Sequence, residues 1–301
     1  MSKFKTWVSA ARLRTLPLSV SGILVGTAIA KSRGFEDHTI FFLALLTTLG
    51  FQITSNFAND YGDGVKGTDN EQRLGPARAL QSGALSRKEL EYGIGISIFF
   101  SLLFAGALLY TSFGLASWEY LLLFGGLALL SIWAAVRYTV GSKAYGYSGL
   151  GDLFVFMFFG LLSVLGTTFL FTKNIEANDF LPAITIGCLS TAVLNLNNLR
   201  DHFGDARAGK RTLVVKIGFE NGRYYHVILI LIALLTLFIY DMNFRSWTAY
   251  LNLLAFVPLG IHLLKVIRVK NPRHLDPELK KMALSTFALA LIFYFLNDKF
   301  L

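Results

Sequence analysis

The sequence predicts an all-α integral membrane protein, a single domain over residues 1–301 with about nine transmembrane helices. Hydrophobic residues make up 54% of the chain and charged residues only 16%, whereas ordinary soluble domains carry about 25% charged residues. Apolar runs close to the roughly 20 residues that cross a bilayer recur along the whole chain. Lipid cannot hydrogen-bond to free backbone groups, and the runs are too long and continuous for barrel strands, so each span is expected to be a helix.

Nine apolar runs define the expected spans. They cover residues 16–30, 39–58, 92–111, 118–136, 153–171, 180–199, 225–240, 247–266 and 282–296. Ahead of the first run, residues 2–14 mix Phe4, Trp7 and Val8 with basic side chains. This mixture is typical of a helix that lies in the membrane interface. We therefore expect an interfacial helix there rather than a cleaved leader.

The formal net charge of +9 indicates a membrane orientation rather than a nucleic-acid partner. Lysine and arginine accumulate on the cytoplasmic side of membrane proteins. With nine spans, 23 of the 28 lysines and arginines fall on the side of the N-terminus. The split predicts a cytoplasmic N-terminus, an outward C-terminus and a multi-pass protein of the cytoplasmic membrane. Because the long polar loops share the N-terminal side, the active site is expected to face the cytoplasm.

Acidic side chains gather where the second and sixth spans end. The second span runs into NFANDYGDGVKGTD (56–69), and the sixth runs into NLNNLRDHFGD (195–205). Each segment contains the pattern Asn-x-x-x-Asp, at 56–60 and at 197–201. A separation of four residues puts both side chains on one helix face. Four spans separate corresponding helix ends, so both segments should face the same side of the membrane, as in a weak internal repeat.

These clusters predict a magnesium site. Neighbouring carboxylates repel one another unless a cation lies between them, and Mg²⁺ is often held by one or two carboxylates plus substrate phosphates. Two facing clusters would therefore clamp a diphosphate through Mg²⁺. The predicted metal ligands are the aspartates of both segments: Asp60, Asp63, Asp69, Asp201 and Asp205. All of these except Asp69 are also predicted to be catalytic.

Asparagine and basic side chains beside the clusters complete the predicted substrate site. Lysine and arginine suit the phosphate oxygens that metal does not bind. The predicted substrate-binding residues of these segments are Asn56, Asn59, Lys66, Arg73, Arg78, Asn197, Arg200 and Lys210. The run GDARAGKR (204–211) approaches a P-loop, but it has Arg211 where Ser or Thr should bind Mg²⁺ and it follows a membrane helix. Nucleotide hydrolysis is therefore not expected.

At these residues the chain resembles the UbiA superfamily of intramembrane aromatic prenyltransferases. The resemblance covers nearly the whole chain. It is carried by RLRTLP (12–17), NDYGDGVKGTD (59–69), RLGPAR (73–78), YTVGSKAYGY (138–147), GLGD (149–152), NNLRD (197–201) and GKRTLVVKIG (209–218). The first family motif often ends in a further aspartate, where this chain has Gly67, with Asp69 two residues later. This departure leaves the role of Asp69 in metal binding open.

The resemblance implies nine helices and transfer of a polyprenyl chain from polyprenyl diphosphate to an aromatic ring. Within the family, the chain is most similar to the branch of menaquinone biosynthesis that prenylates 1,4-dihydroxy-2-naphthoate, with loss of diphosphate and carbon dioxide to give demethylmenaquinone. Metal ions and basic side chains would stabilise the departing charge. The prenyl tail would lie among apolar side chains between the helices.

The acceptor carboxylate implied by this branch needs a cation of its own, because it must approach a diphosphate of like charge. Lys143 is the predicted partner. It lies in the loop between the fourth and fifth spans, near Tyr138, Tyr145 and Tyr147, which would border the aromatic ring. We count Lys143 among the predicted catalytic residues and Tyr138 among the substrate-binding residues.

Two alternatives remain at the level of sequence. The acceptor could be another ring, such as 4-hydroxybenzoate. A transporter is disfavoured, because transporters place charges near the bilayer midplane, whereas the acids here lie at span ends.

Overall fold

The computed structural model describes residues 2–68, 75, 77–244 and 247–297. Within these ranges every regular element is a helix. In chain order they are α1 Lys3–Ala11, η1 Leu13–Thr15, α2 Leu16–Ser32, α3 His38–Val65, α4 Arg87–Phe113, α5 Trp118–Arg137, η2 Tyr145–Ser148, α6 Gly151–Val155, η3 Phe156–Leu162, α7 Ser163–Thr172, η4 Ala177–Asp179, α8 Phe180–Arg207, α9 Leu213–Ile217, α10 Phe219–Asp241, η5 Trp247–Phe256, α11 Val257–Arg268, η6 Pro272–Leu275 and α12 Asp276–Leu296.

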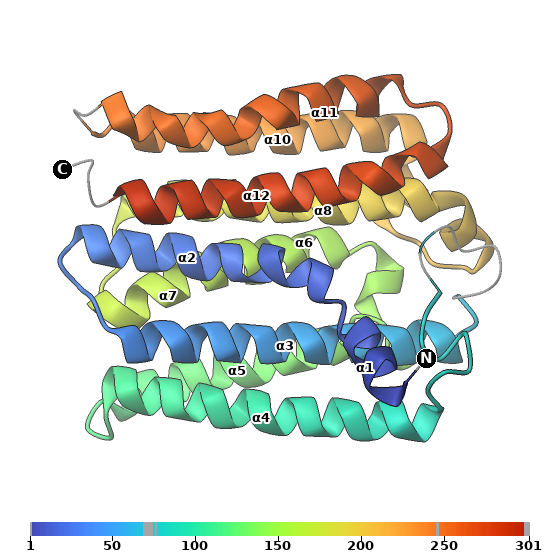
Figure 1. Cartoon of the computed structure of the whole chain (residues 1–301), viewed down its shortest axis with the longest axis horizontal. Helices are drawn as coiled ribbons and strands as arrows, with labels where there is room; N and C mark the ends of the chain where they lie inside the picture. The colour runs from blue at the N-terminus through green and yellow to red at the C-terminus, as the bar shows by residue number, and fades with distance from the viewer. Residues whose placement is uncertain (1, 69–74, 76, 245–246, 298–301) are drawn as a thin grey trace.

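The predicted all-α membrane fold is confirmed. Among the described residues, eight helical segments are long and apolar enough to cross a bilayer, with a ninth if the bent pair α1–α2 is counted as one span. Four of the eight segments are composite, since helical elements follow one another without a break in α6–η3–α7, η4–α8, η5–α11 and η6–α12. The segments lie side by side along the long axis of the molecule, with α10 and α11 at one edge and α4 at the other (Figure 1).

The two helices that carry the acidic segments run well beyond the predicted spans. Helices α3 and α8 are each 28 residues long. The acidic side chains from Asp60 to Asp63 and from Asp201 to Asp205 are therefore in helical turns rather than in the following loops. The C-terminal ends of α3 and α8 lie at the same end of the bundle, together with α1 and the start of α12 (Figure 1). The end of α12 lies at the opposite end.

Helix α8 forms the centre of the bundle. Of its most apolar window, 72% is buried inside the protein, whereas the corresponding value for α5 is 6%. Its neighbours are α2, α10, α12 and the π-helical segment η3. Gly160 of η3 and Gly187 of α8 meet so closely that a Cβ on Gly160 would lie 2.4 Å from the Gly187 Cα. This contact brings the aromatic residues of η3 against the inner face of the bundle.

The N-terminal segment folds as a separate short helix. Ser2 caps α1, and Arg12 then takes a left-handed conformation with φ 51°. The axes of α1 and α2 differ by 49°. The separate helix expected at residues 2–14 is thus present over Lys3–Ala11, and its place in the membrane interface stays a prediction.

Candidate active site

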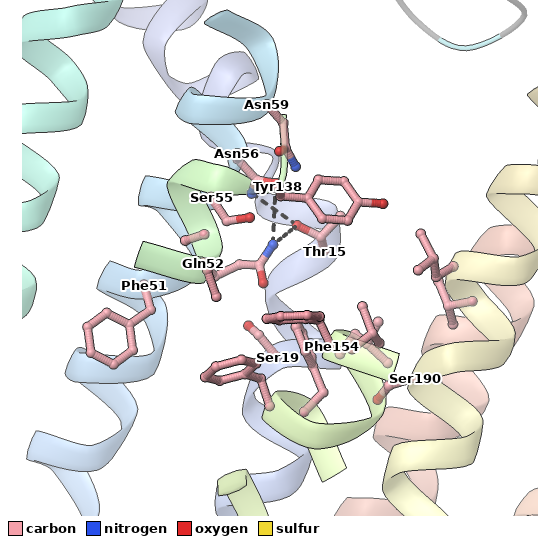
Figure 2. A pocket seen from close by; sticks show the side chains of 18 of the residues that line it. Thr15, Ser19, Phe51, Gln52, Ser55, Asn56, Asn59, Tyr138, Phe154 and Ser190 are labelled. Carbon is pink, nitrogen blue, oxygen red and sulfur yellow. Dashed lines mark hydrogen bonds between the residues drawn. The ribbon is translucent and has the colours of Figure 1, made fainter. Parts of the chain in front are cut away.

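A cavity of about 910 Å³ lies within the bundle between the two acidic helices. Its apolar part is lined by side chains of α4, α5 and the η3–α7 segment, such as Leu108, Phe124 and Phe158. Its polar end is lined by the last turns of α3 and α8. Figure 2 shows Asn56, Asn59 and Tyr138 around this space. One end thus suits a charged group and the other an apolar chain.

Near the C-terminal end of α3, Asn59 and Asp63 line the polar end of the cavity, one helical turn apart. The Tyr147 hydroxyl donates to Asp63 Oδ1 at 2.7 Å, and Lys210 Nζ lies 3.8 Å from Asp63 Oδ2. Thr139 donates to Asn59 Oδ1 at 3.3 Å. Asp63 is thereby held at the cavity wall with the ammonium group of Lys210 beside it.

Asp60 is turned away from the cavity, contrary to its predicted role as a catalytic metal ligand. Its side chain is 1% exposed. Its two oxygens accept the backbone N–H groups of Ala79 and Leu80 at 3.0 and 3.2 Å. With 3.6 residues per turn, the side chains of Asp60 and Asp63 differ in direction by about 60° around the α3 axis, and of the two only Asp63 lines the cavity. Asp60 thus anchors the segment after α3, and these contacts disfavour its predicted role as a metal ligand.

Asn56 does line the cavity, but its amide is part of a hydrogen-bonded group with the N-terminal segment. Asn56 Nδ2 donates to the Ala11 carbonyl at 2.8 Å and to Thr15 Oγ1 at 3.3 Å. Gln52 Nε2 donates to Asn56 Oδ1 at 3.3 Å (Figure 2). Asn56 therefore holds α3 against the turn between α1 and α2.

On α8, Asn197, Asp201 and Asp205 all line the cavity at four-residue spacing. Arg200, whose side chain is 4% exposed, lies among them and donates to both oxygens of Asp201 at 2.9 and 2.7 Å. Its NH2 also donates to Asn197 Oδ1 at 2.9 Å, and its NH1 donates to Asp276 Oδ1 at 2.6 Å. The second predicted cluster is therefore assembled as expected, around an internal arginine.

Tyr147 connects the two sides of the polar end. Lys66 Nζ lies 3.9 Å and Lys210 Nζ 5.2 Å from the centre of its ring. Burial and the carboxylate of Asp63 raise the pKa of Tyr147, so its hydroxyl keeps the proton that it donates to Asp63. Thr68, 2.5 Å from the same oxygen, must then be the donor of their shared bond. Burial lowers the pKa of Lys66, although the charge of Asp63 opposes this shift.

The other predicted residues divide into three groups. Arg78, Lys210 and Tyr138 line the cavity, and their substrate-binding roles stay predictions. Lys66 and Lys143 do not line it, and Lys143 is exposed. Lys143 is thus poorly placed to bind an acceptor carboxylate within the cavity. Asp69 and Arg73 lie outside the described residues.

Several polar residues of the cavity were missed from the sequence. Among them are Arg12, Thr15, Gln52, Ser190, Arg207 and Arg273. Gln52 carries a usable signal, because it is a polar side chain inside a predicted span, one turn before Asn56. Arg273 comes from η6, between the last two spans, and nothing in its local sequence indicates that it reaches the cavity.

The polar end fits a divalent cation shared with a phosphate better than a metal held by protein alone. Among the described residues, no group of three or more His, Cys, Asp or Glu side chains is arranged to hold a metal. The carboxylates of Asp63, Asp201 and Asp205 nevertheless line one cavity, and such hard oxygens are what Mg²⁺ prefers. Mg²⁺ commonly completes its ligand shell with water and substrate phosphate.

The family model described as the UbiA prenyltransferase family matches residues 19–292. This chain belongs to the UbiA prenyltransferase family. The family resemblance inferred from the motifs is therefore confirmed.

Curated relatives of this UbiA-family protein match it over nearly its full length. The 1,4-dihydroxy-2-naphthoate octaprenyltransferase of Haemophilus influenzae is 44% identical over 97% of this chain and 95% of its own. The octaprenyltransferase of the same name from Escherichia coli is 39% identical over the same shares. That of Mycobacterium tuberculosis is 34% identical over 97% of this chain and 96% of its own.

Solved structures support the fold. A UbiA homolog from Aeropyrum pernix K1 has a TM-score of 0.65 at 15% identity, covering 93% of this chain and 99% of its own. A UbiA homolog from Archaeoglobus fulgidus bound to DMAPP and Mg²⁺ has a TM-score of 0.62 at 14% identity, covering 94% and 98%.

Proposed function

We propose that this protein is a Mg²⁺-dependent prenyltransferase of the cytoplasmic membrane. It transfers a polyprenyl chain from polyprenyl diphosphate to 1,4-dihydroxy-2-naphthoate, with release of diphosphate and carbon dioxide. The observation that carries the proposal is that one cavity combines a polar end, with acidic and basic side chains, and an apolar end. The near full-length similarity to octaprenyltransferases of 1,4-dihydroxy-2-naphthoate supports the acceptor.

The diphosphate is proposed to bind between α3 and α8. Asp63, Asp201 and Asp205 would hold Mg²⁺, and Asn59 and Asn197 add amide oxygens beside them. When bound, Mg²⁺ would neutralise the charge that develops on the leaving diphosphate. Arg78 and Lys210 line the same end and would bind phosphate oxygens that carry no metal.

Breaking the allylic C–O bond leaves an electron-poor prenyl carbon, which the ring carbon that bears the carboxylate attacks. The new C–C bond forms at that ring carbon. The bond from the ring to the carboxylate then breaks, carbon dioxide leaves, and the electron pair of the broken bond restores the aromatic ring. The product is the prenylated dihydroxynaphthalene, the reduced form of demethylmenaquinone. Tyr138, Tyr145 and Phe154 line the cavity with aromatic faces, and the Tyr145 and Phe154 rings stack at 4.0 Å. These faces suit a flat acceptor and a developing cation.

Both substrates are proposed to enter at the end of the bundle that faces the cytoplasm. The bias of 23 of 28 lysines and arginines toward that end supports this orientation. The apolar wall would hold the first isoprene units, and the remaining tail would extend toward lipid.

The test is a product assay with purified protein, Mg²⁺ and octaprenyl diphosphate. Equal amounts of 1,4-dihydroxy-2-naphthoate and 4-hydroxybenzoate compete as acceptors, and mass spectrometry identifies the products. We expect the decarboxylated prenyl-naphthalene product. If 4-hydroxybenzoate were prenylated and the naphthoate were not, the family assignment would stand and the proposed acceptor would be wrong.

A further inference from the structure

The guanidinium of Arg200 uses all three of its nitrogens on oxygens from two helices. Two N–H groups fork onto the Asp201 carboxylate, and NH2 also reaches Asn197 Oδ1. NH1 donates to Asp276 Oδ1 at 2.6 Å, across 76 residues of chain. Asp276 stands in the first turn of α12, immediately after the η6 turn whose Arg273 lines the cavity.

This arrangement sets up a competition at the second acidic cluster. A forked pair with arginine engages both oxygens of a carboxylate. Two of the proposed metal ligands, Asn197 and Asp201, are therefore already bonded to Arg200. A divalent cation that binds Asp201 must therefore displace Arg200 from at least one of the two Asp201 oxygens.

Asp276 shares the guanidinium of Arg200 with Asp201. Among the described residues, the two carboxylates that pair with Arg200 are Asp201 and Asp276. A buried arginine that loses one of its partners leaves charge unpaired, which is costly. With Asp276 in place, Arg200 keeps a carboxylate partner when Asp201 turns to metal. Without it, Asp201 would be the sole carboxylate of that pairing.

We propose that Asp276 is a positioning residue of the metal site, which keeps Arg200 anchored so that Asp201 and Asn197 are available to Mg²⁺. The proposal rests on the proposed function. Asp276 acts through Arg200 and touches no substrate. Its side chain is 49% exposed, so its replacement removes a surface carboxylate rather than a core group.

The experiment compares Asp276→Asn with the matched control Glu220→Gln. Glu220 is a carboxylate near the start of α10 that pairs with Arg223 instead of Arg200. In Asp276→Asn, we expect the half-saturating Mg²⁺ concentration for turnover to rise about tenfold, the lower end of what losing a group behind the metal ligands costs. The kcat at saturating Mg²⁺ and the KM for the naphthoate should stay within about twofold. The control should match the wild type.

A second readout needs no turnover. Mg²⁺ that binds the folded protein raises its thermal unfolding midpoint. The Mg²⁺ concentration needed for a given rise of the midpoint should increase in Asp276→Asn by the same factor as in the kinetic assay. Asp276→Glu, which keeps the charge, should recover most of the wild-type value.

Two results would overturn the proposal: an unchanged Mg²⁺ dependence in Asp276→Asn, or a loss of kcat at unchanged Mg²⁺ dependence. If Asp276→Asn does not fold, Arg200→Lys decides through the thermal readout. A single ammonium cannot fork onto Asp201, so a given rise of the midpoint should need about threefold less Mg²⁺. An unchanged or higher concentration contradicts the proposal. If the wild type itself shows no Mg²⁺-dependent turnover or stabilisation, the proposed function fails as well.

Discussion

Asp60 and Asp63 stand three residues apart on α3 and serve different structures. Asp60 is 1% exposed and accepts two backbone N–H groups of the segment that follows α3. Asp63 lines the cavity, where Tyr147 and Lys210 contact its carboxylate. The same acidic motif thus supplies one anchor for the fold and one group for the site.

The two aspartates should therefore respond differently to the same substitution. Asp63→Asn is expected to lower kcat by about 10²-fold or more, because it removes charge where diphosphate and metal would bind. Asp60→Asn should keep kcat within about threefold but destabilise the protein by about 1–3 kcal/mol, because the Asn amide nitrogen that replaces one carboxylate oxygen cannot accept a hydrogen bond from a backbone N–H. Steady-state kinetics and thermal unfolding in detergent measure both. An inactive but fully stable Asp60→Asn protein would contradict this division.

Arg12 is the better candidate for the acceptor carboxylate than Lys143. Arg12 lines the cavity and donates to the Asn56 backbone carbonyl at 3.4 Å. Asn56 lies on α3, seven residues before Asp63. Arg12→Ala should raise the KM for the naphthoate about tenfold or more, since a hydrogen bond to a charged group contributes about 1.5–3 kcal/mol. The KM for the prenyl diphosphate should change by less than about twofold.

Lys143→Ala is the matched control for Arg12→Ala, because Lys143 is exposed and outside the cavity. It should leave both KM values at the wild-type level. A raised naphthoate KM in Lys143→Ala with none in Arg12→Ala would restore the assignment made from sequence.

Membrane orientation is tested by cysteine labelling in a Cys188→Ala background. Exposed positions at opposite ends of the bundle are Lys143, after α5, and Ala116, between α4 and α5. Because positive charge stays in the cytoplasm, Lys143→Cys should react with an impermeant maleimide in inverted vesicles only. Ala116→Cys should react in intact spheroplasts. The opposite labelling pattern would place the cavity mouth outside.

The close approach of η3 to α8 predicts a stability effect at Gly160. A Cβ there would lie 2.4 Å from the Gly187 Cα and 2.8 Å from the Ala183 carbonyl oxygen, so backbone must move. Gly160→Ala is expected to cost about 1–3 kcal/mol. Gly106→Ala, where a Cβ meets nothing within 4 Å, is the matched control and should not lower the unfolding midpoint. Equal midpoints for the two variants would show that this helix pair adapts freely.

The sequence was sufficient to predict the nine segments and the gathering of both acidic clusters at one end. Span length, charge bias and the even number of intervening spans fix these features. The rotation of α3 about its axis was not predictable. The pairs 56–60 and 59–63 both have a separation of four, and only packing against the segment after α3 shows that Asp60 faces away from the cavity.

Contacts between distant segments were also beyond the sequence. Arg12 enters the site because α1 folds back at a left-handed turn, and Asp276 because α12 begins beside α8. Neither residue belongs to an acidic motif or to a polar loop of notable length. Arg12 does belong to the RLRTLP segment that carries part of the family resemblance. Nothing in that segment or around Asp276 indicates a contact with α3 or α8, so these contacts were found from the structure alone.

The central claim is that α3 and α8 together hold a magnesium diphosphate at the polar end of the cavity. The direct measurement is equilibrium binding of an unreactive prenyl thiodiphosphate to the purified protein, with Mg²⁺ or with a chelator. The account predicts that the wild type and Asp60→Asn bind the analogue tightly when Mg²⁺ is present and not when it is chelated. In Asp63→Asn and in Asp201→Asn, the affinity in the presence of Mg²⁺ should fall by about tenfold or more. Binding that ignores Mg²⁺, or that survives both substitutions, would contradict it.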